Sequence, residues 1–178
     1  MRTLHSTPKQ SQYGAAAVEF ALICLIFFSI LFAILELGRM MYVYNTMQEV
    51  TRRAAREAVV SWISTADQNT IKSLALFGGT NIPAGPEITA ANIKIEYLNE
   101  AGGTAFPRPD DPPDNLSACG DLGRVAECIY SVRVSIVDTD GTTALKYSPM
   151  VSLFSTLFNV NLPPATVTMQ AESLGFEI

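Results

Sequence analysis

The sequence predicts an α+β protein in which one long N-terminal helix packs against a small antiparallel sheet. Three observations lead to this fold class. The stretch from Phe20 to Leu35 holds no charged residue, the next two dozen residues continue a helical pattern with no proline, and three later segments alternate apolar and polar residues. At 178 residues the chain has room for one domain of ordinary size and an anchor.

Composition and charge narrow the classes of function. The chain is 48% hydrophobic and 16% charged, whereas soluble domains average about 25% charged residues, so a membrane segment is expected. The net charge is -5, and because Arg2 and Lys9 precede the apolar run, the rest of the chain carries about -7. Nucleic acid is not expected as a partner, since binding its backbone needs clustered Lys and Arg.

The apolar run predicts a membrane-spanning helix over residues 15–37. A helix from Ala15 to Leu37 is about 34 Å long, which is enough to cross a bilayer. The alternative is a buried core helix, but a helix that is apolar on all sides needs a larger protein around it than this chain provides.

The helix is expected to continue over residues 38–64 as an amphipathic extension, so that one helix of about 70 Å runs from about Ala15 to Trp62. Two opposite-charge pairs four residues apart, Glu49 with Arg53 and Arg53 with Glu57, support its polar side. The apolar stripe is expected to pack on the protein's own sheet, with a groove for a partner helix as the alternative. Its residues are Met40, Met47, Val50, Ala54, Ala58 and Trp62.

Residues 65–178 are expected to form the α+β domain. Glycine and proline from Gly78 to Pro86, and again from Gly102 to Asn115, predict irregular loops. A short helix is expected from about Pro149 to Phe158, with Met150, Leu153, Phe154 and Leu157 on one side. Strands are expected at Ile93–Leu98, Tyr130–Asp138 and Thr166–Glu172. In the second strand Val132, Val134 and Ile136 should face the core.

The cysteines predict a disulfide if the domain is exported. Cys119 and Cys128 lie nine positions apart, which fits neither a redox CxxC nor a zinc knuckle. In an oxidising compartment they are expected to close a small loop that adds roughly 2 to 3 kcal/mol of stability. Two reduced thiols are the alternative.

No pattern of residues predicts an active site, a cofactor or a resident metal. The single histidine, His5, precedes the apolar run. The Asp138–Gly141 stretch shares only the start of a calcium loop and is expected to be a turn. The acidic group Asp110, Asp111 and Asp114 is expected to be a solvated loop, with a weak cation site as the alternative.

An ordinary secretory signal has small residues after its apolar run, at the cleavage site. In this sequence the small residues come before the apolar run. The segment Gly14-Ala15-Ala16-Ala17-Val18-Glu19-Phe20, after a basic leader, resembles the class III signal of type IV pilins. That resemblance implies that a membrane-embedded prepilin peptidase cuts between Gly14 and Ala15. Residues 1–14 would then be a cytoplasmic leader, and Glu19 and Phe20 would be the fifth and sixth residues of the processed chain.

The resemblance extends beyond the signal. Glu19-Phe20-Ala21, Glu36-Leu37-Gly38-Arg39 and Ala55-Arg56-Glu57-Ala58 occur in order, and with Gly14 they resemble the start of TadE-like pseudopilins of the tight-adherence (Flp) pilus system. The resemblance implies a pilin-like fold and a structural role in assembling a type IV pilus. Its implied partners are the prepilin peptidase, other pilins or pseudopilins and pilus platform proteins, with no enzymatic activity and no small-molecule substrate.

Charge suggests a role for Glu19 and an orientation for the chain. A carboxylate costs about 2.5 to 3.5 kcal/mol at the bilayer centre, so Glu19 needs a partner or a shallow position. The resemblance to pilins implies that the partner is a neighbouring subunit's N-terminal ammonium. The alternative is that Glu19 reaches the cytoplasmic headgroups. Arg2 and Lys9 favour a cytoplasmic N-terminus in the inner membrane, with the domain outside the cytoplasm.

Three functions therefore compete. The first is a processed pseudopilin that supports assembly of a tight-adherence pilus. The second is an unprocessed, signal-anchored module that binds another envelope protein, and the third is a tethered hydrolase, for which no catalytic residues are visible.

Overall fold

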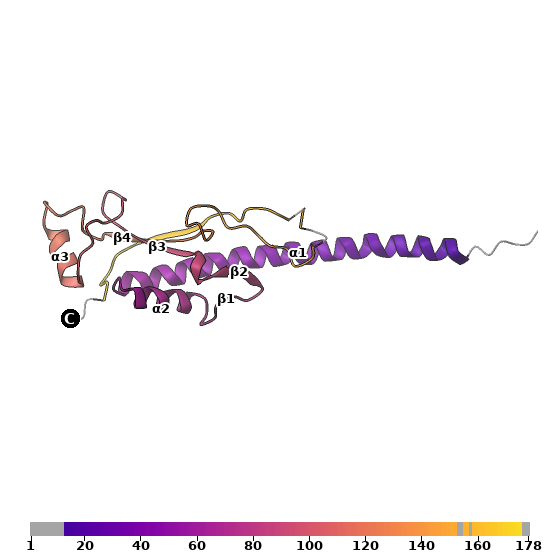
Figure 1. Cartoon of the computed structure of the whole chain (residues 1–178), viewed down its shortest axis with the longest axis horizontal. Helices are drawn as coiled ribbons and strands as arrows, with labels where there is room; N and C mark the ends of the chain where they lie inside the picture. The colour runs from indigo at the N-terminus through magenta and orange to yellow at the C-terminus, as the bar shows by residue number, and fades with distance from the viewer. Residues whose placement is uncertain (1–12, 153–154, 157, 176–178) are drawn as a thin grey trace, which may run out of the picture.

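The long helix α1 (Tyr13–Val60) runs through almost the whole length of the molecule, and every other element gathers around its second half (Figure 1). The computed structural model describes residues 13–152, 155–156 and 158–175. The predicted α+β class is confirmed, and the predicted helix from Ala15 to Trp62 agrees with α1 to within two residues.

The second half of α1 packs on the protein's own domain, as the apolar stripe predicted. Its buried side contacts the strands β4 (Ser131–Ile136) and β5 (Ala165–Gln170) and the short helix α2 (Thr65–Ala75). Of the predicted stripe, Met40 and Trp62 are partly buried against the core. The fully buried members are Met47, Val50, Ala54 and Ala58.

The sheet consists of β3 (Ile93–Leu98), β4 (Ser131–Ile136) and β5 (Ala165–Gln170), antiparallel and in that order. Ile95 lies opposite Val134, which lies opposite Val167. All three predicted strands are present, although β4 and β5 are shorter or shifted by one or two residues. The predicted core face of β4 is confirmed by buried Val132, Val134 and Ile136.

Part of the predicted irregular region is ordered. Between Gly78 and Pro86, where a loop was expected, β1 (Asn81–Ile82) begins a hairpin with β2 (Gly85–Thr89), which leads into the 3-10 turn η1 (Ala90–Asn92). A Cβ on Gly85 would lie 2.7 Å from side-chain atoms of Ile82, so a larger residue there would displace that buried side chain. Helix α2 was also missed, although Ser64 caps it by accepting a hydrogen bond from the Asp67 amide at 3.0 Å.

The second predicted loop was wrong where it covers residues 112–115. Helix α3 (Pro112–Gly120) begins there, with the Asp111 carboxylate accepting the Asp114 amide hydrogen at 2.7 Å. Proline at the first helical positions favours a helix start, because its missing N–H would have no partner there. The predicted helix over 149–158 lies partly outside the described residues, at positions 153, 154 and 157.

Candidate functional site: the bare helix and its exit from the domain

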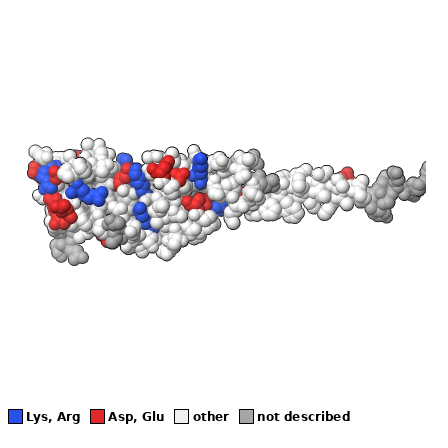
Figure 2. Space-filling view, in the orientation of Figure 1, with Lys and Arg blue, Asp and Glu red and all other residues white. Residues whose placement is uncertain are grey.

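The first half of α1 extends away from the domain as a bare apolar helix. Its large apolar side chains between Val18 and Leu35 are exposed. Figure 1 shows this half of the helix projecting alone, and Figure 2 shows a single acidic patch on it. Glu19 is the only charged residue between Gly14 and Leu35. Within the described residues, α1 is the one helix long and apolar enough to cross a membrane.

The four predicted signal residues lie in the first turns of this bare helix. Gly14, Ala15, Glu19 and Phe20 are all exposed. Ala15 and Glu19 are four residues apart in a continuous helix, so they share a face one turn apart. Cleavage after Gly14 and a role for Glu19 stay predictions.

At the end of the apolar run α1 enters the domain through a group of polar side chains, which we call the exit cluster: Glu36, Arg39, Glu87 and Tyr147. The Glu36 side chain is only 4% exposed. One of its oxygens, Oε1, accepts hydrogen bonds from the Tyr147 hydroxyl at 2.6 Å and from the Met150 amide at 3.1 Å. Arg39 Nη1 donates to the same oxygen at 3.1 Å.

Arg39 uses each of its three nitrogens. Nε donates to the Ala84 carbonyl at 2.8 Å, and Nη1 donates to the Ser148 carbonyl at 2.8 Å and to the Tyr147 hydroxyl at 2.9 Å. Nη2 lies 3.2 Å from Glu87 Oε2. A buried charge is tolerated only when it is paired and hydrogen-bonded in this way, and the fork of donors is specific to arginine.

Tyr147 holds the centre of the exit cluster as a neutral phenol. Burial is the larger cause, and the hydrogen bond to Glu36 the second, of a rise in the pKa of Tyr147 to about 12. The guanidinium of Arg39 lies 4.9 Å from the centre of its ring. The cluster therefore joins α1 to the β1–β2 hairpin and to the 147–150 segment.

Sequence reasoning found only half of the exit cluster. Glu36 and Arg39 appeared as elements of a family resemblance, and Glu87 and Tyr147 were not singled out. A glutamate directly after a long uncharged run was the available signal, because a carboxylate at that depth needs partners. Nothing local in the sequence identifies a tyrosine more than a hundred residues away as one of them.

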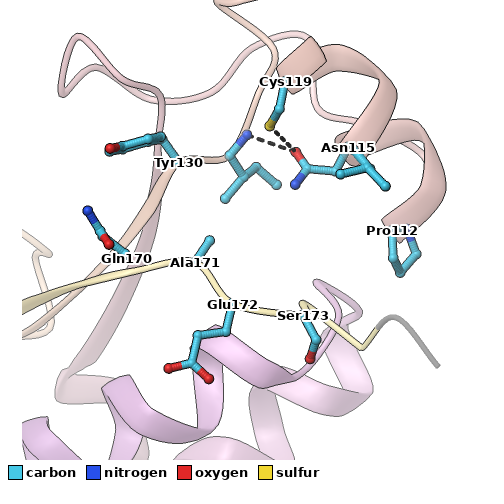
Figure 3. Close-up of a pocket in the computed structure, with 10 residues that line it drawn as sticks. Pro112, Asn115, Cys119, Tyr130, Gln170, Ala171, Glu172 and Ser173 are labelled. Atoms are coloured by element: carbon cyan, nitrogen blue, oxygen red, sulfur yellow. Dashed lines mark hydrogen bonds between the residues drawn. The ribbon is translucent and has the colours of Figure 1, made fainter. Parts of the chain in front are cut away.

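The opposite end of the domain carries a cavity of about 490 Å³ between α3 and the end of β5 (Figure 3). Cys119 in α3 is joined by a disulfide to Cys128, with 4.8 Å between their Cα atoms. Asn115 accepts the Ile129 amide hydrogen at 2.8 Å. These two links attach α3 to the strand that leads into β4.

The acidic residues considered as cation ligands have local partners. Asp111 caps α3, and Asp114 Oδ1 lies 3.0 Å from Arg124 Nη1, which lowers the pKa of Asp114. Hydrogen bonds from Thr143, then Thr142, lower the pKa of Asp140 to about 2. Among the described residues, no group of three or more His, Cys, Asp or Glu could hold a metal.

A long helix that is bare and apolar in one half, and carries a small α+β domain on the other, fits a single-pass membrane protein. The family model described as TadE-like protein matches residues 14–56. The match spans the signal residues, the apolar run and the Glu36–Arg39 step, so it confirms the resemblance over that part of the chain. Comparison with curated proteins and with solved structures found no match.

Proposed function

We propose that this protein is a TadE-like pseudopilin that supports assembly of a tight-adherence pilus as a structural component and not as an enzyme. A prepilin peptidase removes residues 1–14, and the bare half of α1 then holds the chain in the inner membrane with its domain outside the cytoplasm. One observation carries the proposal: the segment matched by the TadE-like model includes a helix half, Gly14–Leu35, that its own domain leaves uncovered. Other subunits, platform proteins and lipid are the partners that such a surface fits.

Glu19 has the position that an assembly contact requires. It is exposed and is the only charge in the bare half of α1. Removal of residues 1–14 creates an ammonium group on Ala15, and in a low-dielectric surrounding a carboxylate attracts such a group strongly. The Glu19 of one subunit and the Ala15 terminus of its neighbour therefore form a charge pair that offsets the unfavourable burial of either alone.

Mass spectrometry of the protein purified from its native membrane tests the processing step. The expected mass is that of a chain beginning at Ala15. A chain that retains Met1, in cells whose prepilin peptidase is active, would contradict the proposal and support the unprocessed signal-anchored module.

Glu19→Ala tests the charge pair separately from processing. The expected result is normal processing and abundance with a clear loss of surface pili, counted by electron microscopy of a strain whose only copy is the variant. Leu22→Ala is the matched control, since Leu22 is exposed on the same bare half but carries no charge, and it should assemble normally. Wild-type piliation in Glu19→Ala cells would remove the proposed pair and leave a headgroup contact as the role of Glu19.

A further inference from the structure

We propose that the domain itself rests on the lipid surface through an apolar collar where α1 leaves it. The collar consists of Leu37, Met41, Met150 and Val160, all of which are exposed. The inference rests on the proposed anchoring of α1 and adds a second membrane contact made by residues far apart in the sequence.

The length of the bare helix places the collar at the membrane boundary. From Gly14 to Leu35 the helix is about 33 Å long, close to the roughly 30 Å thickness of the hydrocarbon core. The outer boundary of that core therefore falls near Glu36. The Met150 amide is 3.1 Å from the Glu36 carboxylate, so Met150 lies at the same depth.

The collar side chains are apolar and uncovered. Met150 is 75% exposed and Met41 is 60% exposed. Met41 and Val160 also line an apolar hollow of about 260 Å³ beside α1. An exposed apolar surface at one end of a domain marks an interaction site, and side chains of this kind are favourable at the boundary between headgroups and acyl chains.

The three charged side chains of the exit cluster, which lie at this depth, are buried inside the domain. Glu36, Arg39 and Glu87 have side chains that are no more than 10% exposed, and they pair with one another. No Asp, Glu, Lys or Arg occurs between Lys146 and Glu172. Figure 2 shows the charged side chains over the rest of the domain, whereas the surface beside the bare helix is mostly uncharged.

The collar adjoins the apolar half of α1, and this favours lipid, over a second copy of the chain, as the partner that contacts it. The collar lies on and beside the same helix that enters the membrane, and Leu37 is two residues beyond Leu35, where the apolar run ends. A bilayer that receives the helix up to Glu36 therefore reaches the collar without any further partner. Lys146 is exposed and precedes Tyr147 in the chain. Its ammonium can therefore bind headgroup phosphates beside the collar.

Fluorescence quenching in vesicles tests the collar in the full chain. In a Cys24→Ser background, bimane is attached under non-reducing conditions to Met150→Cys or to Met41→Cys. The protein is reconstituted into vesicles of phosphatidylethanolamine and phosphatidylglycerol that contain a nitroxide lipid, with the nitroxide either near the headgroup or deep in the acyl chain. The matched controls are Ile30→Cys, in the bare helix, and Leu122→Cys, at the far end of the domain and 95% exposed.

We expect the shallow nitroxide to quench the fluorescence of the labels at residues 150 and 41, and aqueous iodide to leave it unquenched. The label at residue 30 should be quenched by the deep nitroxide, and the label at residue 122 by iodide alone. If the label at residue 30 is quenched but those at 150 and 41 respond only to iodide, the collar is refuted while the membrane anchor stands. Protection of the collar labels from both quenchers shows that protein covers them, which also overturns the inference. If the label at residue 30 is not quenched, the anchor itself fails, and with it the proposed function.

Discussion

At the scale of single residues, two buried tyrosines show how position decides what a hydroxyl group does. The Tyr147 hydroxyl donates to Glu36 and accepts from Arg39. The Tyr97 hydroxyl is buried and has no hydrogen-bond partner among the described residues. Burial is the main cause that raises the pKa of each phenol to about 12, but only Tyr147 is compensated by hydrogen bonds.

Tyr147→Phe is therefore expected to destabilise the protein by about 1 to 3 kcal/mol, because it leaves the Glu36 carboxylate with one donor fewer in a buried site. Urea denaturation of the full chain in detergent, followed by circular dichroism, measures the change. Tyr130→Phe is the control, since Tyr130 is half-exposed, and it should match the wild type. An unchanged denaturation midpoint for Tyr147→Phe would show that the exit cluster does not stabilise the fold.

Tyr97→Phe is expected to leave stability unchanged or to increase it slightly, since it removes a buried hydroxyl that has no partner. It should also make the protein less sensitive to alkali. Below about pH 10 the phenol is protonated in both states, whereas between pH 10 and about 12 only the unfolded state loses the proton, so stability falls as pH rises through this window. Denaturation midpoints at about pH 9 and about pH 11 should differ less in the variant than in the wild type. An equal difference would show that Tyr97 titrates normally in the folded protein.

At the scale of elements, α1 and α3 depend on different sources of stability. α1 is 48 residues long, and its domain half is held by a continuous buried stripe. α3 has nine residues, and a helix this short is marginal without external support. Its support is the Asp111 cap, the ion pair between Asp114 and Arg124, and the link through Cys119.

Replacing Cys119 and Cys128 together by serine is expected to lower the free energy of unfolding by about 2 to 3 kcal/mol, because the unfolded chain is no longer constrained. Hydrogen exchange should speed up over residues 112–120 more than over the sheet. Cys24→Ser, which removes the free cysteine, is the control and should change neither quantity. A non-reduced tryptic digest in which these two cysteines are not linked would show instead that the thiols are unpaired in the native protein.

At the scale of the whole molecule, α1 is one continuous helix with two chemically different halves. The half that ends at Leu35 is apolar apart from Glu19, and the half beyond Glu36 is covered on one side by the sheet and α2. The first half of α1 suits a bilayer, because its side chains are mostly apolar and the backbone N–H and C=O groups of a helix are paired internally. The exit cluster marks where the domain begins along α1.

The predicted orientation can be tested in cells that carry Leu122→Cys in a Cys24→Ser background. An impermeant maleimide added to spheroplasts is expected to label residue 122 fully before the membrane is opened. Ile30→Cys should stay unlabelled, since residue 30 lies in the apolar run. Labelling of residue 122 only after permeabilisation would place the domain in the cytoplasm and contradict the proposed topology.

Much of the architecture could be predicted because its signals are local and periodic. The stripe through Met47 and Ala58 repeats at helical spacing, and the alternation through Val132 and Val134 repeats at strand spacing. Helix α3 was missed because proline and aspartate were taken to indicate a loop, although at a helix start both are favourable. The hairpin of β1 and β2 was missed because it is too short to show a period.

The sequence by itself determined the apolar span, the long helix, the three main strands and the resemblance to TadE-like proteins, because each depends on residues close together in the chain. Only the tertiary structure decided that Glu36 and Arg39 are completed by Glu87 and Tyr147, and that Met150 lies beside the end of the span. These contacts join segments separated by about fifty to more than a hundred residues. Their hydrogen bonds form only once the chain has folded around α1, so no local pattern encodes them.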